Sequence, residues 1–287
     1  MVRVSLVQFP AALRDKEENI ARISAITGDA DADMVVFPET SLTGYSIRDE
    51  THTLAETLDG ESVGRLHDIA RDRGVTLVVG MPLRADVSGF VHNAAVVLPA
   101  DGAPRAYLKH HLVNFGPFDE RYYFIPGDGL LTFRTGGMAF GVTICYDIFF
   151  PEISKSYAME GAEALLNISA SPSVTRVFFE RVLPARAIEN TVYVLYTNLV
   201  RTEKELVFWG GAQALDPRGN LMERGPYYEE AVVTVDLDPA IVRTARPFRP
   251  TIPDTLRAWG DIPSGRRTDT VDGATVDTGL CMRGGPS

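Results

Sequence analysis

The chain has 287 residues, of which 45% are hydrophobic and 23% are charged, and its formal net charge is −10. This length and apolar content suffice for one large α/β domain or two smaller ones. The negative charge disfavours nucleic-acid or anionic-membrane partners, because both reward clustered Lys and Arg. No run approaches the roughly 18 apolar residues of a membrane span, and residues 1–10 lack the pattern of a signal peptide.

In the first half of the chain, strand-like apolar runs alternate with helix-like stretches. Residues 114–129 are rich in aromatic residues, Gly and Pro and predict a long loop, and such loops often carry function. Strands are predicted at 2–9, 34–37, 75–80, 91–98 and 106–108, and helices at 15–28 and 62–73, the second closed by Gly74.

The second half continues the same alternation and then loses it. Strands are predicted at 138–144, 164–168, 191–197 and 231–237, helices at 151–160 and 178–190, and a hairpin from 211–215 through the turn at 216–220. We interpret residues 1–260 as one domain. Residues 261–287 have too few apolar residues to fold alone, and we expect this extension to contribute to an oligomer interface.

The two cysteines, Cys145 and Cys281, lie far apart in different settings. They do not form a disulfide framework, so we expect a cytoplasmic protein in a reducing compartment. Neither has a second cysteine or a histidine at ligand spacing, so no metal site is expected.

Three chemically complementary side chains each follow a predicted buried strand. Cys145 follows the run at 138–144, Glu39 follows 34–38, and Lys109 follows 106–108. Taken singly, each has a structural explanation: a buried cysteine, a carboxylate in an ion pair, and a solvated lysine. Together they supply a thiol nucleophile, a base for its proton, and a cation for a thiolate or an oxyanion. Glu120 is a candidate to orient Lys109 or the leaving amine, the alternative being a surface acid.

At these residues the chain resembles the nitrilase, or carbon–nitrogen hydrolase, superfamily. The matching stretches are 36–45 (VFPETSLTGY), 107–112 (YLKHHL), 141–147 (GVTICYD) and 150–152 (FPE). They occur in the family's order, and the resemblance spans roughly residues 2–240. It identifies the predicted domain as a carbon–nitrogen hydrolase domain.

The resemblance implies an α/β fold, a four-layer α-β-β-α sandwich whose subunits pair into an eight-layer homodimer or a higher homo-oligomer. It implies that Glu39, Lys109 and Cys145 form the catalytic set and that Glu120 is the family's additional glutamate. The amide of Tyr146 would complete the oxyanion hole with Lys109. The family's hydrolysis needs no cofactor and no metal.

The residues around the cysteine indicate the branch. True nitrilases usually have Trp-Glu after the cysteine, whereas Tyr146-Asp147 is similar to the amidases. Residues 109–124 and 167–172 are also similar to glutaminase domains of glutamine-dependent NAD synthetases. However, we expect no synthetase domain in this protein, and Tyr146 replaces the usual glutamate. We therefore expect a cysteine-dependent amidase that converts a small linear carboxamide to a carboxylic acid and ammonia through a thioester.

The alternatives are an N-carbamoyl amine or acid amidohydrolase, a glutaminase-type ammonia donor, an acyltransferase, and a catalytically inactive binding or regulatory protein. For substrate binding we expect an aromatic acyl side and a polar strand end, although each residue also suits a core or turn role. The aromatic candidates are Tyr45, Phe115, Tyr122 and Phe149, and the polar candidates are Asn167, Ser169 and Ser171. His110 and His111 are expected to pack around Lys109, because Glu39 already serves as base.

Overall fold

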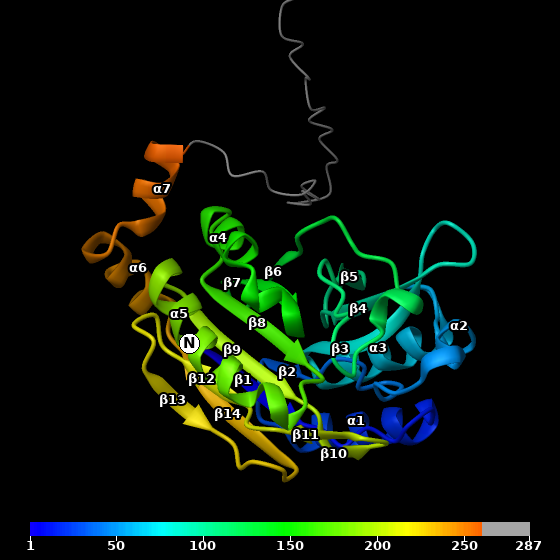
Figure 1. The fold of residues 1–287 in the computed structure, drawn as a ribbon. Helices are drawn as coiled ribbons and strands as arrows, with labels where there is room; N and C mark the ends of the chain where they lie inside the picture. The colour runs from blue at the N-terminus through cyan, green and yellow to red at the C-terminus, as the bar shows by residue number, and fades with distance from the viewer. Residues whose placement is uncertain (260–287) are drawn as a thin grey trace, which may run out of the picture.

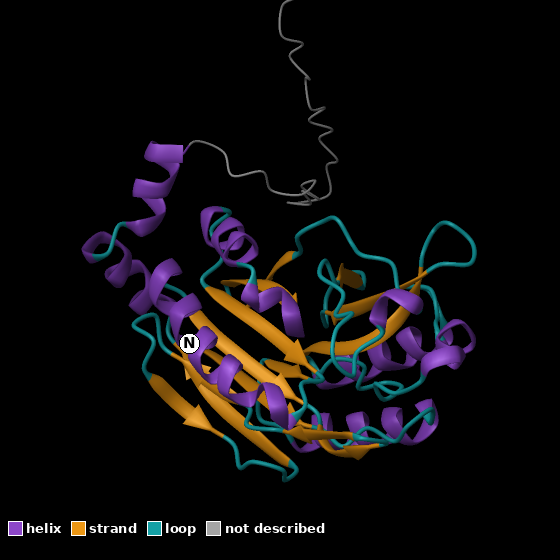
Figure 2. Cartoon of the chain, in the orientation of Figure 1, coloured by secondary structure: helices purple, strands orange, loops and turns teal. Residues whose placement is uncertain are grey.

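The computed structural model describes residues 1–259 and consists of two facing β-sheets with helices on their outer sides (Figures 1 and 2). The predicted α-β-β-α layering is thus confirmed. Both the extension at 261–287 and Cys281 lie outside the described residues. No helix within residues 1–259 combines the length and apolar composition needed to cross a membrane.

The first sheet has six strands in the order β14-β1-β2-β3-β4-β5. Strands β1, β2 and β3 run parallel, and helices α1 (Lys16–Asp29) and α3 (Glu61–Arg73) connect them. The remaining neighbours pair antiparallel. The strands are β1 (Val2–Gln8), β2 (Met34–Val36), β3 (Thr76–Arg84), β4 (Val91–Leu98), β5 (Arg105–Leu108) and β14 (Ala231–Leu237).

The second sheet also has six strands, in the order β13-β12-β9-β8-β7-β6. Strands β7, β8 and β9 run parallel, and helices α4 (Pro151–Met159) and α5 (Arg176–Asn190) connect them. The strands are β6 (Thr132–Thr135), β7 (Met138–Ile144), β8 (Ala164–Ser169), β9 (Tyr193–Asn198), β12 (Gln213–Leu215) and β13 (Leu221–Arg224).

Alternation along the strands places one set of apolar residues between the sheets and another under the helices. Leu6 and Val36 of the first sheet belong to the same buried core as Leu166 of the second. Their sequence neighbours Val7 and Val35 pack in the core that α1 and α3 complete. The sandwich is therefore closed on both faces of the first sheet, and the loops at its strand ends carry the polar residues.

Several elements were not predicted from the sequence. Strand β6 and the hairpin of β10 (Val200–Glu203) and β11 (Leu206–Trp209) were missed because each strand has only four residues, too few to show a clear alternation. The other unpredicted elements are α2 (Thr51–Leu54), α6 (Pro239–Phe248), α7 (Thr251–Trp259) and the 3₁₀ turns η1 (Arg48–Glu50), η2 (Glu120–Tyr122), η3 (Cys145–Phe149) and η4 (Ser173–Thr175). Helix α6 begins where Asp238 caps the amide of Ala240, a signal present in the sequence.

Candidate active site

Glu39 is completely buried in the loop after β2, and three donors hold its carboxylate. Lys109 Nζ and Asn93 Nδ2 both donate to Oε1 at 2.7 Å. The amide of Ala170, which follows β8 in the other sheet, donates to Oε2 at 2.6 Å. A buried carboxylate requires such partners. They fix its position between the two sheets.

Lys109 is also completely buried and bridges two carboxylates. Its ammonium donates to Glu39 Oε1 at 2.7 Å and to Glu120 Oε1 at 2.8 Å. Burial lowers the pKa of Lys109, but the charges of Glu120 and Glu39 outweigh it and raise that pKa well above its usual value. Lys109 is therefore a fixed cation. We call Glu39, Lys109 and Glu120 the charged cluster.

Glu120 lies in the predicted long loop but is only 3% exposed. Tyr45 donates its hydroxyl to Oε1 at 2.8 Å, and the amide of Val113 donates to Oε2 at 3.0 Å. Burial raises the pKa of Glu120, while Lys109 opposes the rise. The surface-acid alternative for Glu120 is thereby excluded.

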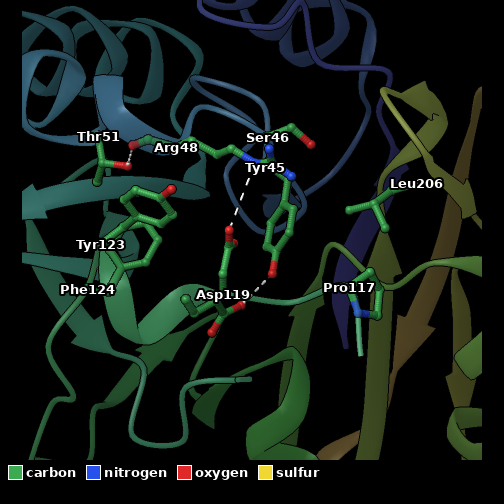
Figure 3. A pocket seen from close by; sticks show the side chains of 10 residues that line it. Tyr45, Ser46, Arg48, Thr51, Pro117, Asp119, Tyr123, Phe124 and Leu206 are labelled. Carbon is green, nitrogen blue, oxygen red and sulfur yellow. Dashed lines mark hydrogen bonds and ion pairs between the residues drawn. The ribbon is translucent and has the colours of Figure 1, made fainter. Parts of the chain in front are cut away.

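A small cavity of about 30 Å³ lies against the side of Tyr45 and Glu120, and Arg48, Asp119 and Tyr123 also line it (Figure 3). This volume accommodates water rather than an amide with a side chain. The cavity therefore borders the charged cluster.

Cys145 begins η3 directly after β7, with a φ of +48° and 9% of its surface exposed. A positive φ is costly for a residue with a Cβ, and such strain concentrates at functional sites. Burial and the Glu39 charge raise the pKa of the Cys145 thiol well above its ordinary value, although Lys109 acts in the opposite direction. The thiol is therefore protonated at neutral pH and needs a base during attack.

Asp147 holds the turn that carries Cys145. Its Oδ2 accepts the Tyr107 hydroxyl at 2.9 Å, and its Oδ1 accepts the backbone amide and Nδ1 of His111 at 2.8 and 3.0 Å. The His111 ring stacks on Phe150, with centroids 3.4 Å apart. These contacts tie η3 to the segment of Lys109. They give His111 a packing role, as predicted, while His110 hydrogen-bonds the carbonyl of Gly129.

The predicted polar residues, which lie in β8 or just after it, are all buried. Asn167 donates to the carbonyl of Cys145 at 3.3 Å and accepts the Ser169 hydroxyl at 2.9 Å. Ser169 also contacts the Cys145 thiol and lowers its pKa. Ser171 is engaged with Asn198 and with the indole of Trp209. Asn167 and Ser169 therefore adjoin the cysteine, whereas the bonds of Ser171 join neighbouring strands.

The predicted aromatic residues separate into two groups. Phe115 and Phe149 both pack on the ring of Tyr146, at 5.5 and 5.8 Å between centroids. Tyr45 reaches the charged cluster through its hydroxyl. Tyr122, by contrast, is 81% exposed, and its ring contacts Tyr123. The structure therefore does not bring Tyr122 to the other candidates.

Three residues that sequence reasoning missed support the charged cluster. Asn93 interrupts the apolar strand β4, a signal that was available, and it donates to Glu39. Glu203 of β10 is buried and accepts the backbone amides of Tyr45 and Ser46, both at 2.9 Å. Gly80 of β3 lets the Glu39 loop approach, because a Cβ there would lie 2.4 Å from the Pro38 carbonyl oxygen.

The arrangement places a thiol near a buried carboxylate and a fixed cation. Tyr146, the second residue of η3, contributes an amide in the first turn, where N–H groups lack partners within the helix. Such a set can stabilise negative charge on a carbonyl oxygen during nucleophilic attack.

The chain matches the model of the carbon-nitrogen hydrolase family over residues 3–247. It is 33% identical to a protein named nitrilase from Pyrococcus abyssi, over 86% of this chain and 93% of that protein. It is 36% identical to a glutamine-dependent NAD(+) synthetase from Thermotoga maritima over 83% of this chain, and spans only 42% of that protein.

A solved structure of an amidase from Nesterenkonia sp. AN1 superimposes with a TM-score of 0.76 and 27% sequence identity, covering 90% of this chain and 100% of that one. That amidase carries acrylamide added to its active-site cysteine. The family match and the sequence relatives agree on the family of this chain. The chain belongs to the carbon–nitrogen hydrolase family.

Proposed function

We propose that this protein is a cysteine-dependent amidase that hydrolyses a linear carboxamide to a carboxylic acid and ammonia. The observation that carries the proposal is the position of Lys109. It is buried between Glu39 and Glu120, and the charge of the nearby Cys145 also raises its pKa. A buried cation between two carboxylates is expensive to maintain. A role in stabilising charge that develops on a substrate explains it.

In the first half of the reaction, the thiol attacks the amide carbonyl and its proton passes to Glu39. The oxyanion of the tetrahedral intermediate is stabilised by the Lys109 ammonium and the Tyr146 amide. Protonated Glu39 gives the proton to the leaving nitrogen, and ammonia departs. The acyl group remains on Cys145 as a thioester.

In the second half, water attacks the thioester and Glu39 takes one of its protons. The second tetrahedral intermediate collapses, the carboxylic acid leaves, and the proton returns to the sulfur of Cys145. The sum is amide plus water giving acid plus ammonia. Glu120 remains ionised throughout and keeps Lys109 in place, as its two bonds from Lys109 and Tyr45 support.

Amides are favoured over nitriles by Tyr146-Asp147 after the cysteine and by the likeness to the Nesterenkonia amidase. The similarity to an NAD synthetase keeps glutamine among the substrates to be tested. N-carbamoyl compounds need the same thiol chemistry but release carbon dioxide as well.

The test is a measurement of ammonia release from short aliphatic amides, ω-amido acids, glutamine, N-carbamoyl amines and the matching nitriles. We expect turnover of at least one carboxamide, none by a Cys145→Ala variant, and a protein mass increased by the acyl group when the reaction is quenched. Carbon dioxide release identifies a carbamoyl hydrolase instead. Failure of the wild type on every compound, or turnover by Cys145→Ala, contradicts the proposal.

We also propose a cytoplasmic homo-oligomer. Apolar side chains are exposed on α5 and at the end of α6. The exposed fraction is 54% for Phe178 and 92% for Phe248. Exposed apolar surface of this kind is typical of an interface between subunits. A reducing compartment suits the free thiol of Cys145. Light scattering should give at least twice the monomer mass, and a monomer at micromolar concentration contradicts the assembly.

A further inference from the structure

The hydroxyl of Tyr196 is completely buried and makes no hydrogen bond of good geometry with any atom of residues 1–259. Buried polar groups are nearly always paired, because an unpaired one loses its water without compensation. The unpaired hydroxyl of Tyr196 therefore requires an explanation.

The position of Tyr196 in the sheet relates it to the candidate nucleophile. In the parallel strands β7, β8 and β9, Thr143, Asn167 and Tyr196 are register partners. Residues in register point to the same face of a sheet, so these side chains share one face. Asn167 donates to the carbonyl of Cys145, which lies two residues after Thr143. Tyr196 thus stands one strand beyond the residue that contacts Cys145.

The serine hydroxyls beside Tyr196 direct their own protons to other acceptors. Ser169 and Ser171 both approach the Tyr196 hydroxyl and lower its pKa, but neither accepts its proton in good geometry. The proton of Ser169 goes to Asn167, and Ser171 Oγ is engaged by Trp209 Nε1 and by Thr175 Oγ1. Burial raises the pKa of Tyr196 well above its usual value, and the nearby Cys145 acts in the same direction. Its hydroxyl therefore keeps its proton at neutral pH.

The ring of Tyr196 is held on two sides. Trp209 stacks on it with centroids 5.2 Å apart and planes at 19°, and Phe179 contacts it at 5.4 Å. Trp209 and Phe179 are themselves buried. The hydroxyl is consequently fixed in position before any ligand arrives, which reduces the entropic cost of binding one.

We propose that Tyr196 is a specificity-determining residue whose hydroxyl donates a hydrogen bond to an oxygen acceptor on the substrate. This inference rests on the proposed amidase function. Because that reaction releases ammonia, the acceptor belongs to the acyl part. The preferred substrates are therefore carboxamides whose acyl chain carries a hydroxyl, carbonyl or carboxylate oxygen, and apolar acyl chains leave Tyr196 unpaired.

The experiment compares wild type and Tyr196→Phe on pairs of amides of equal shape. The pairs are 3-hydroxybutanamide with 3-methylbutanamide, and succinamate with 4-methylpentanamide. In each pair that the wild type discriminates, kcat/KM of the variant for the oxygen-bearing amide should fall about 10-fold. A loss of this size is expected because the variant lacks one hydrogen bond to the substrate. The kcat/KM for the apolar amide of the pair should change less than threefold. The midpoint of thermal unfolding should stay equal or rise, because an unpaired buried hydroxyl is removed.

Tyr193→Phe is the matched control, since Tyr193 lies on the same strand but donates to the distant carbonyl of Asp238. It should leave the ratio between the paired substrates unchanged. Two results would overturn the role of Tyr196 and leave the amidase function standing. One is an equal loss of kcat/KM for both members of each pair, and the other is a lower unfolding midpoint in Tyr196→Phe than in Tyr193→Phe. Absence of ammonia release from every amide by the wild type would instead contradict the amidase function itself.

Discussion

Tyr45 and Glu120 share a hydrogen bond of 2.8 Å that ends on the same carboxylate oxygen as the ammonium of Lys109. The backbone of Tyr45 is itself held by Glu203 from the β10–β11 hairpin. A connected set of contacts therefore runs from this hairpin through Tyr45 and Glu120 to Lys109. Residues remote in the sequence thus position the cation of the candidate active site.

Replacing Tyr45 with Phe should shift the acidic limb of the pH profile of kcat/KM to higher pH. The Tyr45 hydroxyl favours the charged form of Glu120, so its loss raises a pKa that burial has already raised. Glu120 then becomes protonated at higher pH and holds Lys109 less firmly. Tyr227→Phe, which also removes a tyrosine bond to a glutamate, should leave the profile unchanged. An unshifted limb in Tyr45→Phe would contradict this link.

Lys109→Arg should lower kcat by about 100- to 1,000-fold, the usual effect of losing one oxyanion donor. The charge is retained, but the larger planar guanidinium does not fit where the compact ammonium contacts Glu39 and Glu120 at 2.7 and 2.8 Å. Steady-state ammonia release measures the effect. Lys155→Arg is the control, since Lys155 donates to the carbonyl of Glu189 on α5. Full turnover by a folded Lys109→Arg variant would exclude the assigned role.

Glu39→Gln should abolish amide hydrolysis and yet make the Cys145 thiol more acidic. Burial is the larger cause of its raised pKa, but the Glu39 charge contributes and the substitution removes it. The pH midpoint of Cys145 alkylation by a small neutral thiol reagent, followed by peptide mass spectrometry, should therefore fall. In the wild type it should lie above that of an exposed thiol. A midpoint that rises in the variant would show that Glu39 does not act on the thiol as a charge.

Gly80→Ala should displace the Glu39 loop, because the new Cβ would lie 2.4 Å from both the Pro38 carbonyl oxygen and the Thr40 nitrogen. We expect a loss of about 1–3 kcal/mol in unfolding free energy from overpacking. A loss of about 100-fold in kcat should accompany it, as misplacement of a catalytic group typically causes. Gly64→Ala on the exposed face of α3 meets no atom within 4 Å and should be neutral or stabilising. Unfolding in urea and ammonia release measure the two effects.

The sequence by itself determined the alternation of strands and helices and the candidate set of Glu39, Lys109, Glu120 and Cys145. The longer strands show their periodicity locally, and chemically distinctive residues at strand ends are visible without coordinates. The cap of α6 at Asp238 is an equally local signal. The same reading offered no way to choose between Phe115 and Tyr122 as pocket walls, because both are aromatic residues in one loop.

Only the tertiary structure decided how these groups meet. The amide of Ala170 donates to Glu39 across the two sheets, although the two residues are far apart in the sequence. Glu203 accepts a hydrogen bond from the backbone amide of Tyr45, and it lies in the β10–β11 hairpin, which the sequence pattern did not predict. Long-range packing also decided that the Cys145 thiol is protonated, because its pKa depends on burial and on the Glu39 charge. Burial and hydrogen-bond partners are properties of the folded chain, which is why the unpaired hydroxyl of Tyr196 emerged only there.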